Sequence, residues 1–370
     1  MRWDAQRLDF DEPSTLPGLP DVRGLLRTVQ VPEFPNLTFH EVRAKSALNA
    51  VPKGSAMPFG HTINPYRGCS HACVYCFARG THEWLELDSG TDFDQQIVVK
   101  TNIVDVLRRE LARPSWRREH VALGTNTDPY QRAEGRYRVM PGIIDALAGS
   151  GTPFSVLTKG TLARRDVPRL VAVSRDVPIG MGVSMAIWDD DLHHALEPGV
   201  PTPRARLDLV RAITDAGLPC GVFLAPVLPG LTDQEEHLDA AIGAIAQAGA
   251  TGVTVLPLHL RPGAREWFTA WLAREHPGLV GRYRQLYGRG AYVPAEYRSW
   301  LAGRAAPILA RHGLDRQSGG VARGVDPFAD PGSSLGLPGD ESVGFPAGSL
   351  PARRPDQTVE AAEPEQLSLC

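Results

Sequence analysis

Long apolar runs are absent from this 370-residue sequence, and so is a large excess of one charge. No run approaches the ~18 apolar residues that a membrane-spanning helix requires, because Gly, Pro and Ser interrupt the longest candidates near 179–188 and 221–231. The formal net charge is only −3, so bulk electrostatics do not indicate nucleic-acid binding. We therefore expect a globular protein that is not embedded in a membrane.

Cysteine is scarce, with five residues in the whole chain. An odd count, in a long chain that does not open on a secretion signal, disfavours a disulfide framework. The sequence therefore predicts reduced cysteines and a cytoplasmic protein. We also expect a monomer.

The middle of the chain alternates short apolar runs with amphipathic stretches, which is typical of repeated β-α units. A helix is predicted to begin at Thr202-Pro203 and to close at Gly217. A capping-box pattern over 232–235 predicts another helix that ends at Gly249, and 140–147 and 162–171 fill earlier gaps. Six units fit either an open doubly wound sheet or a partial barrel, with the site at the carboxyl ends of the strands. The predicted strands are 60–64, 120–125, 153–158, 178–185, 219–226 and 251–257.

Composition divides the chain into four parts. Residues 1–40 are polar and proline-rich and are expected to form a partly mobile arm. Residues 41–260 hold the β-α core, and 261–315 are helical and aromatic, which predicts an extension that closes one side of the core. Residues 316–370 are rich in Gly, Pro, Ser and acidic residues, so we expect a disordered tail.

Three of the five cysteines share one loop after the first predicted strand, as Cys69-x3-Cys73-x2-Cys76. Three thiolates on one tight loop can each bind one iron of a cubane cluster, which leaves the fourth iron open to a further ligand. A zinc site with His71 is the main alternative, although zinc ligands are usually separated by at least two residues. Cys220 lies in an apolar run and Cys370 ends a polar tail, so neither is an obvious fourth ligand.

The cysteine loop resembles the signature of the radical S-adenosylmethionine (SAM) superfamily. The surrounding sequence, Asn-Pro-Tyr-Arg-Gly-Cys-x-His-x-Cys-x-Tyr-Cys-x-Ala-Arg, is similar to the spore photolyase-like branch, often labelled "DNA repair photolyase". The resemblance covers about residues 40–315 and includes further motifs near 125–131, 157–159, 196–199 and 225–233. It implies the partial (β/α)6 TIM-type barrel of that superfamily.

The resemblance also implies cofactors and a reaction. Cys69, Cys73 and Cys76 would bind a [4Fe-4S] cluster, and the open iron would chelate the amino and carboxyl groups of SAM. An external flavodoxin- or ferredoxin-type donor would supply one electron. Reductive cleavage of SAM would then give a 5′-deoxyadenosyl radical that abstracts hydrogen from the substrate. Two alternatives stay open: a zinc-binding module, and an iron-sulfur redox or regulatory protein that does not turn over SAM.

Polar residues at predicted strand ends are the other candidate ligands. Thr125, Asn126 and Asp128 follow strand two, where the Asp128 carboxylate would meet the SAM ammonium or the substrate; a turn or capping cluster is the structural alternative. Lys159 ends strand three, and the resemblance suggests that it binds the SAM carboxylate. Ser184 ends strand four and is placed to bond the amino-acid part or the ribose.

Tyr75, Pro226 and Leu228 complete the predicted cofactor site, because the resemblance places these positions near the adenine. Glu197 is expected to position the loop after strand four and not to act in catalysis. Four single histidines are interpreted as structural or solvated: His61, His193, His194 and His259.

The substrate is not specified by these motifs, and a nucleic acid, a peptide or a small metabolite all remain open. Spore photolyase needs a cysteine after strand two to return hydrogen to its thymine lesion. This chain has no cysteine between Cys76 and Cys220. The sequence therefore argues against repair of spore-type thymine dimers.

Overall fold

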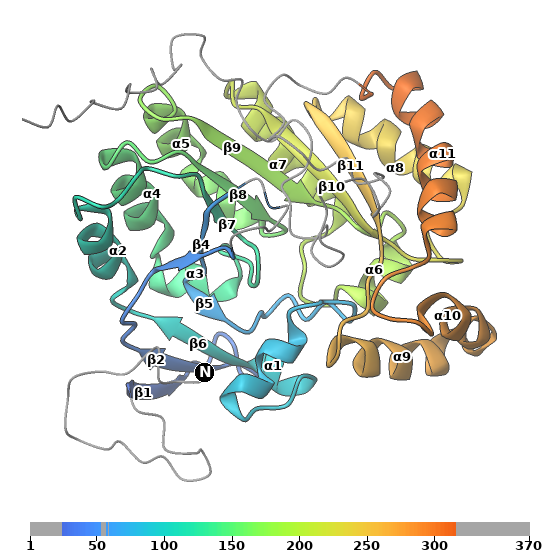
Figure 1. Ribbon diagram of the computed structural model, residues 1–370, viewed down its shortest axis with the longest axis horizontal. Helices are drawn as coiled ribbons and strands as arrows, with labels where there is room; N and C mark the ends of the chain where they lie inside the picture. The colour runs from blue at the N-terminus through green and yellow to red at the C-terminus, as the bar shows by residue number, and fades with distance from the viewer. Residues whose placement is uncertain (1–23, 53–56, 58, 316–370) are drawn as a thin grey trace, which may run out of the picture.

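A seven-stranded sheet forms the centre of the computed structural model, which describes residues 24–52, 57 and 59–315. Its order is β11-β10-β9-β8-β7-β4-β3 (Figure 1), and every neighbouring pair from β4 to β11 is parallel. Only β3 runs antiparallel, against β4. The strands are β3 (Leu48–Ala50), β4 (His61–Ile63), β7 (Val121–Leu123), β8 (Phe154–Thr158), β9 (Ile179–Ser184), β10 (Cys220–Val227) and β11 (Gly252–Pro257).

The six predicted strands are confirmed as β4 and β7 to β11, each within a few residues of its expected bounds. Every residue of β7 and of β9 is buried, as in a parallel sheet that is covered on both faces. Sequential β-α units place successive strands side by side, so the order follows the chain. The described residues therefore form a mixed α/β fold around six parallel strands, as the sequence predicts, and the sheet is open and arched.

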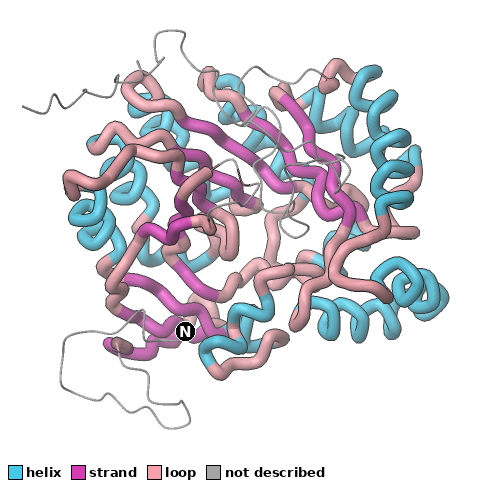
Figure 2. The backbone as a smooth tube through the Cα atoms, viewed as in Figure 1, coloured by secondary structure: helices cyan, strands magenta, loops and turns pink. Residues whose placement is uncertain are grey.

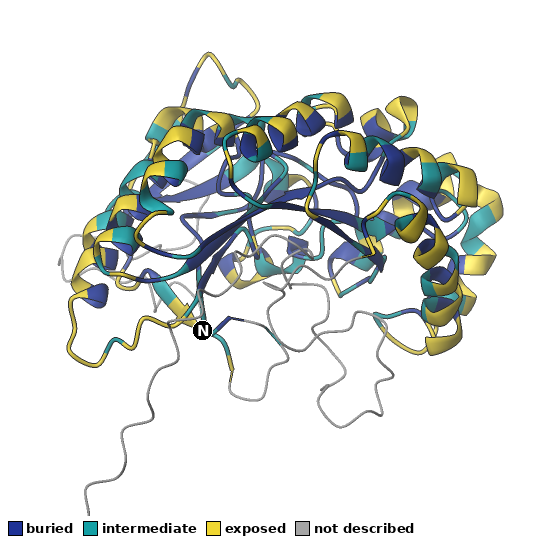
Figure 3. Ribbon diagram, turned by 90° about the horizontal axis from the view of Figure 1, so that it is seen from above, coloured by how far each residue is buried: buried dark blue, intermediate teal, exposed yellow. Residues whose placement is uncertain are grey.

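Helices follow the strands and cover the outer side of the arch (Figure 3). Figure 2 shows irregular segments between the sheet and the lower helices, where the cysteine loop lies. The core helices are α2 (Ile103–Leu111), α3 (Arg132–Tyr137), α4 (Met140–Gly149), α5 (Val167–Val173), α6 (Asp190–Leu196), α7 (Pro203–Asp215) and α8 (Glu235–Gln247). Short 3-10 helices are η2 (Arg79–Thr81), η3 (Glu83–Leu85), η4 (Thr161–Asp166) and η5 (Pro277–Leu279).

Helix starts agree with the sequence in one case and differ in two. Thr202 caps α7, because its hydroxyl accepts the backbone N–H of Ala205. The capping box predicted at 232–235 is wrong: α8 begins at Glu235, and the Thr232 hydroxyl instead accepts the N–H of Leu228. The single helix predicted over 162–171 divides into η4 and α5, with Pro168 in the first turn of α5.

A second sheet, in the order β1-β2-β6-β5, lies beside the first. Its strands are β1 (Leu25–Gln30), β2 (Thr38–Val42), β5 (Tyr66–Arg67) and β6 (Gln96–Lys100), and α1 (Thr91–Gln95) leads into β6. The expected arm without regular structure therefore does not extend to residue 40. Edge strand β1 is largely exposed and lacks an apolar alternation, which hid it in the sequence. Residues 1–23 and the predicted tail at 316–370 lie outside the described residues.

In the described residues, three α-helices follow β11: α9 (Ala264–Glu275), α10 (Val280–Tyr287) and α11 (Ala295–Arg311). Helix α11 lies next to α8 and the edge strand β11 (Figure 1). Phe268 packs against Trp271 and Tyr283 through ring contacts of 5.6 and 5.5 Å between centroids. No helix of the described residues is long and apolar enough to cross a membrane.

Candidate active site

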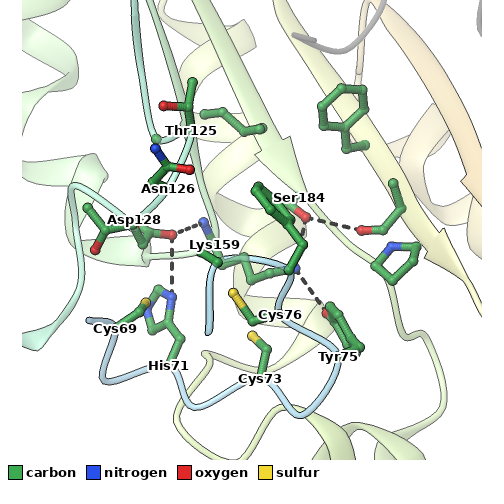
Figure 4. Close-up of a pocket in the computed structure, with 18 of the residues that line it drawn as sticks. Cys69, His71, Cys73, Tyr75, Cys76, Thr125, Asn126, Asp128, Lys159 and Ser184 are labelled. Carbon is green, nitrogen blue, oxygen red and sulfur yellow. Dashed lines mark hydrogen bonds and ion pairs between the residues drawn. The ribbon is translucent and has the colours of Figure 1, made fainter. Parts of the chain in front are cut away.

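A pocket with about 920 Å³ of space, its open mouth included, lies where the loops after β4 and β7 to β11 meet. Parallel sheets place their sites at this edge, since the carboxyl ends of the strands converge there. Figure 4 shows the cysteine loop below, with side chains from β7, β8 and β9 above it. The predicted residues that line it are Cys69, Cys73, Cys76, Tyr75, Thr125, Asn126, Asp128, Lys159, Ser184 and Pro226.

The three cysteines of the loop are free thiols on one wall of the pocket. Gly68 precedes them with a φ of +75°, and an added Cβ would lie 2.9 Å from the carbonyl oxygen of Phe93. Burial raises the pKa of the Cys73 thiol well above its usual value, and burial together with the nearby Cys69 raises that of Cys76 to about 11. Such thiols lose their protons when a metal binds them.

The donor set fits an iron-sulfur cluster, in which each thiolate binds a different iron. Among the residues that the structure describes, no three or more His, Cys, Asp or Glu side chains converge on a single metal ion. His71 is already paired with a carboxylate, since its Nδ1 lies 3.3 Å from Asp128 Oδ2. Burial alone would lower the pKa of His71, but Asp128 and Cys69 raise it to about 10.

The Asp128 carboxylate is held inside the protein on both oxygens. Oδ1 accepts the Thr158 hydroxyl at 2.6 Å and the N–H of Tyr130 at 2.8 Å, and Oδ2 accepts the N–H of Lys159 at 2.6 Å. Burial would raise its pKa, yet the charge on His71 and these bonds hold it below the usual value. Asp128 therefore links the cysteine loop to the end of β8. This is the role expected from the structural alternative, in which residues 125–128 form a turn cluster.

Thr125 and Asn126 lie just beyond β7. The Thr125 hydroxyl donates to Asn64 Oδ1 at 3.5 Å, and the same oxygen accepts the N–H of Asn126 at 3.3 Å. Thr125 is buried, whereas Asn126 is exposed at the pocket. The amide of Asn126 is therefore the more accessible polar group of this pair.

Lys159 reaches the middle of the pocket from the end of β8 (Figure 4). Its Nζ donates to Ser184 Oγ at 2.8 Å, to Tyr75 Oη at 3.1 Å and to Glu197 Oε1 at 3.0 Å. An ammonium group has three protons, so these partners account for all of them. In this structure, Lys159 holds the Ser184 and Tyr75 hydroxyls and pairs with an internal carboxylate.

Glu197 is a site residue whose hydrogen-bond and ion-pair partners could not be predicted from the sequence. It is fully buried, accepts the Tyr75 hydroxyl, and binds Arg206 Nη2 at 2.7 Å through Oε2. Burial would raise the pKa of this carboxyl, but Arg206 and Lys159 outweigh it and lower the pKa to about 2. Tyr75 and Lys159 come from distant parts of the chain. The sequence therefore showed the motif Glu197-Pro198-Gly199 after strand four but not the residues that it binds.

The opposite wall of the pocket is apolar. Phe223, Pro226 and Leu256 line it, together with His259. His259 stacks on Tyr292 with an 18° angle between the rings and lies 5.4 Å from the Phe77 ring centre. The sequence missed His259 as a pocket residue because a single histidine carries no spacing signal. Leu228, which directly follows β10, is fully buried and is not among the residues that line the pocket.

Comparisons with known proteins agree with this site. A family model described as the radical SAM superfamily matches residues 63–241, which include the three cysteines. Uncharacterized proteins of Mycobacterium tuberculosis and Mycobacterium bovis are each 60% identical over 318 residues, which cover 85% of this chain and 93% of theirs. The chain belongs to the radical SAM superfamily. Membership implies a [4Fe-4S] cluster, SAM and a source of electrons.

Solved structures of spore photoproduct lyase share the fold. Spore photoproduct lyase complexed with dinucleoside spore photoproduct superposes with a TM-score of 0.56 and 13% identity, over 75% of this chain and 80% of that chain. A variant of that enzyme with bound AdoMet and the same dinucleoside also gives 0.56, at 14% identity, over 74% of this chain and 79% of that chain. At this identity the likeness concerns the fold alone.

Proposed function

We propose that this protein is a radical SAM enzyme whose Cys69, Cys73 and Cys76 hold a [4Fe-4S] cluster. The observation that carries the proposal is the meeting of three free thiols with Lys159 and Ser184 in one pocket at the carboxyl ends of the parallel strands. When bound, the cluster would supply the one electron that breaks a carbon–sulfur bond of SAM, which gives methionine and a 5′-deoxyadenosyl radical able to take a hydrogen atom from the substrate. A flavodoxin- or ferredoxin-type protein is the proposed reductant.

The two walls of the pocket suit the two ends of SAM. The hydroxyl of Ser184 and the amide of Asn126 offer hydrogen bonds to the amino-acid part, while Thr125 and the backbone of Asn126 are both held by Asn64. The apolar side, which includes Pro226, and the ring of Tyr75 offer surfaces for adenine. Because Lys159 is held by Glu197 through a single oxygen, an incoming carboxylate can replace Glu197 while Arg206 keeps the other oxygen. Leu228 is buried outside the pocket lining, so we assign it no contact with SAM.

Among the described residues, the thiols that line the pocket are Cys69, Cys73 and Cys76, so we propose that the hydrogen donor that closes the cycle is not a further protein thiol of this pocket. Cys220 is fully buried in β10 and does not line the pocket. The lyase with the shared fold binds a dinucleoside photoproduct, and we propose a nucleic acid as the first substrate class to test here. Binding of single- and double-stranded DNA that weakens steeply between low and moderate salt supports that class, and no binding at low salt excludes it.

Iron analysis tests the cluster assignment. After anaerobic reconstitution we expect about four irons per chain, and a large loss of iron from Cys69→Ala, Cys73→Ala and Cys76→Ala. Cys220→Ala is the matched control, because it removes a buried thiol that lies outside the pocket. Zinc in place of iron, or equal iron in all four variants, contradicts the assignment.

A further inference from the structure

Arg79 is a fully buried arginine three residues after the last cysteine of the loop. A guanidinium group does not lose its proton inside a protein, so burial requires that its charge and donors be matched. Arg79 begins η2, and its own backbone N–H donates to the carbonyl oxygen of Cys76 at 3.3 Å. The residue is therefore joined to the cysteine loop by its backbone as well as by its side chain.

The side chain of Arg79 binds the carbonyl oxygen of Cys73 twice. Nε donates at 3.1 Å and Nη2 at 2.9 Å, which is a forked contact that a lysine cannot reproduce. Nη1 donates to the carbonyl oxygens of Ser89 and Gly90 at 3.2 and 2.8 Å. The guanidinium thus fixes the middle cysteine to the segment that leads into α1.

Asp94 neutralises this buried charge. Arg79 Nη2 lies 2.9 Å from Asp94 Oδ1 and 3.0 Å from Oδ2. The rings of Phe93 and Trp267 flank the guanidinium, with centroids 5.3 and 5.0 Å from its central carbon. Trp267 belongs to α9, so the helical extension encloses the pair and keeps it from water.

Both charges of the pair act on a proposed cluster ligand. Arg79 donates from its side chain to the carbonyl oxygen of Cys73 and from its backbone to that of Cys76, and Asp94 lies against the same guanidinium. Charges that contact the backbone of two proposed ligands are close enough to be felt by the metal that those ligands bind. Net charge and hydrogen bonding near the sulfurs are among the main determinants of the reduction potential of an iron-sulfur cluster.

We propose that the Arg79–Asp94 pair sets the reduction potential of the cluster held by Cys69, Cys73 and Cys76, and that Arg79 is a positioning residue for Cys73. The inference rests on the proposed function. Reduction adds one negative charge to the cluster, so the guanidinium favours the reduced state and the carboxylate opposes it. The balance of these two charges determines how readily the reductant transfers an electron to the cluster.

Asp94→Asn is the primary test, since the asparagine oxygen still accepts from Arg79 while the negative charge is removed. Burial, partly offset by Arg79, raises the pKa of Asp94 to about 6, so the comparison is made at pH 8, where the carboxylate is ionised. A redox titration followed by electron paramagnetic resonance should show a higher midpoint potential. We expect about a tenfold larger ratio of reduced to oxidised cluster at a fixed potential, which corresponds to ~59 mV for one electron.

The double variant Arg79→Met/Asp94→Asn removes both charges and should return the potential toward that of the wild type. Structural damage alone would not produce such a return. Glu134→Gln is the matched control, because Glu134 is another fully buried carboxylate, bound to Arg165 at 2.6 Å and outside the pocket. Arg79→Lys keeps the charge but loses the fork, so we expect an unchanged potential and a lower iron content.

An Asp94→Asn potential equal to that of the wild type, or a shift of the same size in Glu134→Gln, overturns the inference. If Asp94→Asn does not retain its cluster, the reduction potentials of the double variant and of Arg79→Lys are measured instead. The inference is overturned if both of these potentials lie far from the wild-type value. Failure of the wild type to assemble an iron-sulfur cluster is a different result, and it removes the proposed function itself.

Discussion

Glu197 connects four separate parts of the chain through one carboxylate. It binds Tyr75 of the cysteine loop, Lys159 at the end of β8 and Arg206 of α7, and Arg206 Nη1 also donates to the carbonyl oxygen of Ser184 at 2.8 Å. Two cations share this one anion, so the group carries a net positive charge beside the pocket. Such a charge balance favours an anionic group of the ligand at Lys159.

Replacement of Glu197 by Gln should lower the free energy of unfolding by about 3–5 kcal/mol, because the substitution leaves Arg206 buried without its counter-charge. Urea unfolding of the reconstituted protein measures this loss. Glu296→Gln, at an exposed position in the first turn of α11, should change stability by no more than about 1 kcal/mol. Equal small losses in the two variants would show that Glu197 does not organise the site.

At the scale of elements, the loop after α6 packs directly on the cysteine loop. The N–H of Gly199 donates to the carbonyl oxygen of His71 at 3.1 Å, and the N–H of Val74 donates to that of Leu196 at 2.9 Å. A Cβ on Gly199 would lie 2.1 Å from the carbonyl oxygen of Ser70. The backbone of one loop therefore fixes the other, and glycine is required at the closest approach.

Gly199→Ala should displace the cysteine loop and reduce the iron bound per chain severalfold. Gly303→Ala is the control: Gly303 lies inside α11 with no atom within 4 Å of an added Cβ, so alanine should stabilise the helix by up to about 1 kcal/mol. Iron content of both purified variants is the measurement. Full iron in Gly199→Ala would mean that the two loops can separate without loss of the site.

Local patterns in the sequence were sufficient to predict the strands of the parallel sheet and the cysteine loop. The strands of the parallel sheet are continuous apolar runs, and the cysteine spacing lies within one loop, so both are visible without tertiary structure. Networks that cross the fold were not visible. The motifs contain Glu197 and Arg79 but do not reveal their partners Lys159 and Trp267, because those residues lie far away along the chain.

At the scale of the whole molecule, the open sheet brings the two halves of the pocket together. The cysteine loop and β7 to β9 supply thiols and polar groups, while β10 and the segment after β11 supply the apolar wall. Helix α9 then covers Arg79 behind the cysteine loop through Trp267. The predicted division of the chain at 260 stays a prediction; beyond it, α11 contacts α8 and β11 of the core.

Formation of 5′-deoxyadenosine tests the account most directly. The reconstituted protein is incubated with SAM and a strong reductant without oxygen, and the product is measured by mass spectrometry beside Cys73→Ala and Cys220→Ala. We expect product from the wild type and from Cys220→Ala, and none from Cys73→Ala. No product from a wild-type protein with a full iron complement, with or without added DNA, would contradict radical SAM chemistry and favour an iron-sulfur protein that binds without turnover.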